Sequence, residues 1–190
     1  MLSAGSYFGE VAFIYDCRRT STVKAKLYAT LGVIDYTTMF ELMNDHPMFA
    51  EHMRSDIIKT YDDDLKLFLM NALKRVDYLK DATDDILVQL AYCCVPDIKE
   101  KGVHLHNVQE DPEQQLNDEM VIIFDGMIEL YVTMDTDVEL QIELLPAGSV
   151  INAHNMLTNR RHNINARFTT NTSFYYLKYS KLVEVGLAYP

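Results

Sequence analysis

The stretch GSYFGEVAFIYDCRRTSTVKA, residues 5–25, carries most of the information about the fold and about binding. Gly9 allows a backbone conformation that other residues avoid and lets a ligand approach closely. Residues 10–14 can form one short helix, whose free N–H groups favour an anion. Arg19 can add a bidentate contact to a phosphate, and Glu10 is an acceptor suited to sugar hydroxyls. On physical grounds alone, both an anion site and a purely structural role stay open.

The order and spacing of these residues resemble the phosphate-binding cassette of cyclic-nucleotide-binding domains. In that family, F-G-E is followed at a fixed distance by R-[TA]-x-[TS]-[VI]. Phe8-Gly9-Glu10 and Arg19-Thr20-Ser21-Thr22-Val23 match this pattern without a gap. The resemblance implies an α+β fold, in which a jelly-roll-like antiparallel β-roll is flanked by helices. It also implies cAMP or cGMP as the ligand, with no other cofactor and no metal.

The resemblance implies a role for each matching residue. Glu10 would accept a hydrogen bond from the ribose 2′-hydroxyl, Arg19 would pair with the exocyclic phosphate oxygens, and backbone amides would surround that phosphate. Thr20 occupies a position where cGMP-preferring kinases and cyclic-nucleotide-gated channels carry threonine, but hyperpolarisation-activated channels, which favour cAMP, carry it too. The choice between cAMP and cGMP therefore stays open. The implied ligand-binding residues are Gly9, Glu10, Val11, Ala12, Arg19, Thr20 and Ser21.

The remainder of the chain alternates between strand and helix patterns. Residues 22–35 mix β-branched and apolar residues and predict one or two strands. Helical spacing begins at Thr37, and an amphipathic helix is predicted over residues 65–79. Strands return after Pro96, and this order predicts an α+β arrangement rather than βαβ units. The later predicted elements are strands at Val103–Val108, Met120–Phe124, Met127–Thr133, Val138–Leu145 and within 164–178, and a short helix at 179–186.

Residues 60–190 resemble a second, altered copy of the same module. Gly148 begins the segment equivalent to the cassette, but the chain reads Ile151-Asn152-Ala153 where F-G-E is expected. Ala153 cannot accept a hydrogen bond from a ribose hydroxyl, and we expect Asn152 to lack the backbone freedom of glycine. The second module is therefore expected to bind no nucleotide and to be structural.

Arg160 and Arg161 are the remaining cationic feature of the second module. The stretch before them is two residues shorter than in the first module, so they form either a second anion site or a solvated loop. Residues 1–59, by contrast, resemble only the C-terminal part of a first module: the cassette, the last strands and the helices that follow. We therefore expect the chain to be part of a longer parent protein, and Met1 need not be its true start.

Charge and hydropathy restrict the partners. The net charge is −11, and residues 60–190 carry 21 acidic and 11 basic residues, whereas residues 1–59 balance to −1. An acidic surface is a poor partner for nucleic acid or for an anionic membrane. No apolar run approaches the ~18–20 residues that span a bilayer, so direct membrane insertion of this segment is not expected.

The cysteines and histidines predict no metal site. The three cysteines include no C-x-x-C pair, which is typical of structural thiols in a reducing compartment. His104 and His106 would share a face of a strand, but further zinc ligands are not evident nearby. A cytoplasmic location, including the cytoplasmic side of a membrane protein, is therefore expected.

Three functions fit these features. Residues 28–53 are similar to the last strand and the helices of channel modules, which favours a regulatory region of a cyclic-nucleotide-regulated cation channel whose helices move when the first module binds ligand. The alternatives are the regulatory part of a cyclic-nucleotide-dependent kinase, and a scaffold that kept the fold without binding nucleotide. The oligomeric state stays open. Enzymatic activity is not expected, since no nucleophile–base pair appears.

Overall fold

The computed structural model describes residues 1–14, 19–46, 48–49, 52–53, 56–57, 64–108, 118–134, 138–158 and 164–188. The chain divides into two compact units, Met1–Asp63 and Asp64–Pro190. None of the helices within these described ranges is both long and apolar enough to cross a membrane.

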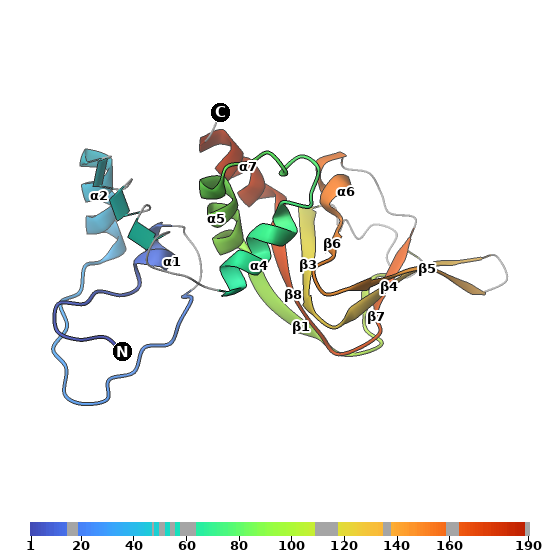
Figure 1. Ribbon diagram of the computed structural model, residues 1–190, viewed down its shortest axis with the longest axis horizontal. Helices are drawn as coiled ribbons and strands as arrows, with labels where there is room; N and C mark the ends of the chain where they lie inside the picture. The colour runs from blue at the N-terminus through green and yellow to red at the C-terminus, as the bar shows by residue number, and fades with distance from the viewer. Residues whose placement is uncertain are drawn as a thin grey trace. The chain divides into compact units, whose positions relative to one another are not determined.

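The first unit contains helices α1, Glu10–Ile14, and α2, Tyr36–Asp45 (Figure 1). The ring of Phe13 in α1 meets the ring of Tyr36 edge to face, with 5.1 Å between the ring centroids. Asp35 is the N-cap of α2, because its side chain accepts a hydrogen bond from the backbone N–H of Thr38 at 2.9 Å. The helix predicted over residues 10–14 is therefore confirmed, as is a helix beginning near Thr37.

The strands predicted for residues 22–35 are wrong, because residues 19–35 are all described and contain no strand. A strand needs a neighbour for its backbone N–H and C=O groups, and the described part of the first unit offers none. Apolar side chains that a sheet would bury are instead exposed: Val23, Leu27, Tyr28, Leu31, Val33 and Ile34. A sequence with the residue pattern of a strand therefore does not form a strand here, because the described part of this unit lacks a neighbouring strand to pair with it.

The second unit contains two four-stranded antiparallel sheets, in the orders β1-β8-β3-β6 and β2-β7-β4-β5. The strands are β1 Val95–Lys99, β2 His104–His106, β3 Glu119–Asp125, β4 Met127–Thr133, β5 Glu139–Pro146, β6 Val150–Ile151, β7 Asn165–Phe168 and β8 Thr172–Lys178. The helices are α4 Asp64–Leu73, α5 Asp84–Cys93, α6 Ala153–Thr158 and α7 Tyr179–Ala188. Figure 1 shows α4, α5 and α7 grouped beside the sheets of this unit, with α6 next to β3 and β6.

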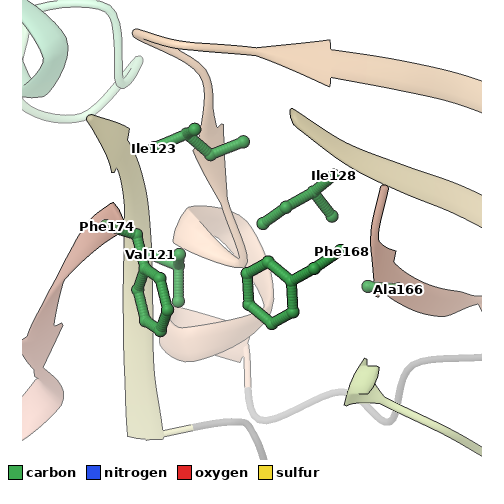
Figure 2. Close-up of a cluster of buried hydrophobic side chains, with 6 residues drawn as sticks. All are labelled: Val121, Ile123, Ile128, Ala166, Phe168 and Phe174. Atoms are coloured by element: carbon green, nitrogen blue, oxygen red, sulfur yellow. The ribbon is translucent and has the colours of Figure 1, made fainter. Parts of the chain in front are cut away.

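The core of this unit is formed by the inner faces of both sheets (Figure 2). Phe168 of β7 and Phe174 of β8 stack with 5.4 Å between their ring centroids. Burial of each such side chain stabilises the fold by about 1.5–3 kcal/mol. The six residues of this cluster, none more than 4% exposed, are Val121, Ile123, Ile128, Ala166, Phe168 and Phe174.

The predicted helix over 65–79 ends early, because α4 stops at Leu73. Lys74 still donates its backbone N–H to the carbonyl four residues earlier, whereas Arg75 and Val76 donate to carbonyls only three residues earlier. The chain has therefore tightened into a series of turns, which orient residues 74–81 differently from a continued α-helix.

Candidate functional site

Gly9 directly precedes the short helix of the predicted cassette. Its φ is +93°, in the left-handed region that side chains disfavour, and α1 begins at the next residue. A Cβ atom at this position would overlap the guanidinium of Arg19. Glycine is therefore favoured by the backbone conformation, and its missing side chain leaves room for the Arg19 guanidinium in the position that it occupies.

Arg19 lies against the beginning of α1. Its Nη1 donates a hydrogen bond to the carbonyl oxygen of Gly9 at 3.0 Å. The side chain is exposed, and a guanidinium carries five N–H donors, of which this bond uses one. The geometry thus leaves donors that an anion at the surface can reach.

Glu10 is a buried charged residue, with 8% of its surface exposed. Burial of a carboxylate is costly unless polar groups compensate for the lost water. Phe8, two residues earlier, is 45% exposed. An acceptor group is thus held inside the fold next to the glycine that Arg19 contacts.

The remaining predicted ligand-binding residues flank these three. Val11 is buried and Ala12 is half-buried in α1, and Thr20 and Ser21 follow Arg19 in an exposed bend. The structure thus joins the two ends of the cassette through Arg19 and Gly9. Residues 15–18 between these ends lie outside the described residues, as do Arg160 and Arg161.

Asn152 repeats the backbone conformation of Gly9 in the second unit. Gly148 and Asn152 have φ of +86° and +69°, and Gly5 and Gly9, which have the same spacing, have +85° and +93°. α6 begins directly after Asn152, just as α1 begins directly after Gly9. The expectation that Asn152 would lack this conformation was wrong, because asparagine tolerates the left-handed region better than most residues. That preference could have identified the position from the sequence.

The acceptor of the first segment is not repeated in the second. Ala153 begins α6 where Glu10 begins α1. The side chain of Asn152 is turned toward the sheet, since its Nδ2 donates to the backbone carbonyl of Glu119 at 2.6 Å. The second segment therefore keeps the turn, the left-handed residue and the helix, but not the carboxylate.

The structure defines the surroundings of Cys94 and His104, two of the described cysteines and histidines. In the described ranges, no group of three or more His, Cys, Asp or Glu side chains could hold a metal ion. Burial raises the pKa of the Cys94 thiol far above its usual value, and the neighbouring Cys93 adds to this rise. The Nε2 atom of His104 lies 2.9 Å from the Tyr131 hydroxyl, within hydrogen-bond distance.

Several solved structures with similar folds carry names of cyclic-nucleotide-binding proteins, and others are named as domains of transcriptional regulators. Cyclic-AMP-bound PfPKA-R (residues 141–441 of that protein) is 18% identical with a TM-score of 0.57, over 66% of this chain and 43% of that chain. A cyclic nucleotide-binding-like protein from Brucella abortus bv. 1 str. 9-941 is 18% identical with a TM-score of 0.55, over 63% of this chain and 97% of that chain. A cyclic nucleotide-binding domain from Methylobacillus flagellatus KT is 14% identical with a TM-score of 0.54, over 66% of this chain and 67% of that chain.

No protein-family model and no curated protein sequence matches the chain. The chain also spans less than half the length of the PfPKA-R structure. The likeness therefore concerns the fold: the antiparallel sheets and flanking helices of Asp64–Pro190 form the β-roll fold of cyclic-nucleotide-binding domains.

Proposed function

We propose that the segment Gly9–Ser21 binds a cyclic nucleotide and that the chain is a regulatory region controlled by this ligand. The observation that carries the proposal is the contact of Arg19 with left-handed Gly9, immediately before buried Glu10. A cyclic nucleotide presents anionic phosphate oxygens and a ribose hydroxyl. The guanidinium donates to the first, and the carboxylate accepts from the second.

The proposed ligand is cAMP or cGMP, without a further cofactor or a metal. The similar fold of a structure named as cAMP-bound supports cAMP as a candidate. Thr20 is exposed next to Arg19, where its hydroxyl could meet a purine base, and this position is compatible with either nucleotide. A direct comparison of the two affinities would identify the preferred ligand.

The second unit has a structural role in this proposal and binds no nucleotide. Ala153 offers no acceptor for a ribose hydroxyl, although the backbone around Asn152 is that of a cassette. Residues 60–190 also carry ten more acidic than basic residues. This charge raises the electrostatic cost of holding a phosphate there.

The parent protein that we propose is a cyclic-nucleotide-regulated cation channel, in which binding at Gly9–Ser21 moves α2 and the residues after it. The support is the sequence likeness of residues 28–53 to channel modules, of which the helical part includes α2, whereas residues 28–35 form no strand. A kinase regulatory subunit is the second candidate, since PfPKA-R has a similar fold. In both cases the region would act in the cytoplasm on other parts of a longer protein and would catalyse no reaction itself.

Calorimetric titration of the full-length protein with cAMP and with cGMP tests the site. Arg19→Ala removes a charge-assisted contact and should weaken binding by about 1.5–3 kcal/mol, roughly ten- to a hundredfold. Lys24→Ala removes another exposed cation of the same unit and should change the affinity by less than about twofold. Unchanged affinity in Arg19→Ala would contradict the assignment, and no binding by the native protein would favour a scaffold that kept only the fold.

A further inference from the structure

Two side chains from the turns after α4 bond to the two ends of the segment Gly148–Ala153. Arg75 Nη1 donates to the carbonyl oxygen of Gly148 at 3.3 Å. The hydroxyl of Tyr78 donates to the carbonyl oxygen of Ala153 at 3.1 Å. The donors are three residues apart, and they lie 73 and 75 residues before their acceptors. One short stretch of chain therefore bridges both ends of the cassette-like segment.

Arg75 lies close to its acceptor, and Tyr78 is in the protonated form that a donor needs. A Cβ atom added to Gly148 would come within 3.2 Å of Arg75 Nη1, so the guanidinium lies directly against this turn. Tyr78 is 38% exposed, but partial desolvation of its hydroxyl raises its pKa to about 12. The phenol therefore keeps the proton that it donates at every pH near neutrality.

The sheet holds the same segment from β3. The backbone N–H of Gly148 donates to Ile123 at 2.8 Å, and the N–H of Ile123 donates to Ser149 at 3.0 Å. Asn152 donates from its side chain to Glu119, also in β3. The segment is thus bonded to a strand and, in addition, to the turns that follow α4.

We propose that Arg75 and Tyr78 form a latch that keeps Gly148–Ala153 in the conformation of a cassette without any nucleotide. A ligand stabilises a loop only while it is bound, whereas these donors belong to the chain and are always present. Together with the bonds from β3, the latch explains how the second unit has the turn, the left-handed residue and the helix without the carboxylate. It goes beyond the proposed function, because it does not depend on binding at Gly9–Ser21.

Amide hydrogen exchange of the full-length protein tests the latch. In the double variant Arg75→Ala, Tyr78→Phe, peptides covering residues 146–158 should exchange about tenfold faster, because two hydrogen bonds that hold the segment are lost. Peptides from β8 should keep their native rates. Tyr179→Phe is the matched control, since it removes a hydroxyl from an exposed tyrosine in α7 and should leave residues 146–158 unchanged. If the double variant misfolds, Tyr78→Phe alone keeps the ring and should still accelerate exchange in the same peptides.

Two results would overturn the latch. One is an amide exchange rate over residues 146–158 that equals the rate of the native protein, in variants that remain folded. The other is slower exchange of these residues when saturating cAMP or cGMP is added to the native protein, because a latched segment should not respond to nucleotide. Accelerated exchange in the variants supports the latch even if nucleotide fails to protect residues 5–25, an outcome that would count against the proposed function alone.

Discussion

Gly9 and Asn152 place a left-handed residue directly before a short helix. Glycine adopts this conformation without steric cost, and asparagine is among the few other residues that tolerate it. The two positions differ in their surroundings. The Arg19 guanidinium fills the space beside Gly9, whereas Asn152 uses its side chain to bond to Glu119. A side chain at position 9 would therefore be strained by the left-handed backbone and would displace the Arg19 guanidinium from the Gly9 carbonyl.

Gly9→Ala tests this expectation without any change of charge. An alanine in the left-handed region costs about 1–2 kcal/mol, and its Cβ would also displace the guanidinium of Arg19. We expect at least about tenfold weaker binding in a competition titration with a fluorescent cyclic nucleotide. Gly32→Ala is the control, because its added Cβ meets open space. Native affinity in Gly9→Ala would mean that neither the conformation nor the space at Gly9 matters for the ligand.

The sequence predicts best the helices and strands that are long enough for their apolar residues to repeat with a regular helical or strand spacing. Met127–Thr133 is predicted and observed with the same bounds as β4, and the helix predicted at 179–186 is α7. β6, with two residues, and α6, with six, are too short to show a period and were not predicted. Residues 22–35 show the opposite case, in which a clear pattern lacks a partner strand. A strand pattern in the sequence therefore predicts a strand correctly only where a neighbouring strand is present to pair with it.

The N-cap of α2 gives a prediction on pH. Hydrogen bonds from the backbone N–H and the hydroxyl of Thr38 lower the pKa of the Asp35 carboxyl below its ordinary value of 3.8. The cap favours the charged form, so its stabilisation of α2 is complete above pH 3.8 and is lost as the pH falls through the lowered pKa. Carbon chemical shifts of residues 36–45, followed by NMR during acid titration, should show this loss of helicity.

Asp35→Asn is the matched variant for this titration. The asparagine side chain can still accept from the N–H of Thr38, but it does not titrate. Its α2 shifts should therefore lack the acid transition that the native protein shows. The same transition in both proteins would mean that another group controls the helix.

At the scale of the whole chain, both units place a left-handed residue directly before a short helix, with different side chains around it. The first has Glu10 and Arg19 beside a left-handed glycine, and the second has the same backbone turn inside a packed β-roll but neither the carboxylate nor a balanced charge. The residues of the proposed first site lie within one short stretch, so the sequence could name them together, and their binding of nucleotide stays a prediction. The bonds from Arg75 and Tyr78 could not be predicted, because their acceptors lie more than 70 residues along the chain.

The central claim is that Gly9–Ser21 binds nucleotide and that the segment after Gly148 does not. Equilibrium dialysis with labelled cAMP or cGMP measures it most directly, as the number of nucleotides bound per chain of the full-length protein. We predict that, at a nucleotide concentration near the native Kd, Arg19→Ala lowers the number bound per chain, because its affinity is about ten- to a hundredfold weaker. Arg160→Ala, outside the described residues, should leave this number at the native value. An unchanged number in Arg19→Ala, or a loss in Arg160→Ala, would contradict the claim.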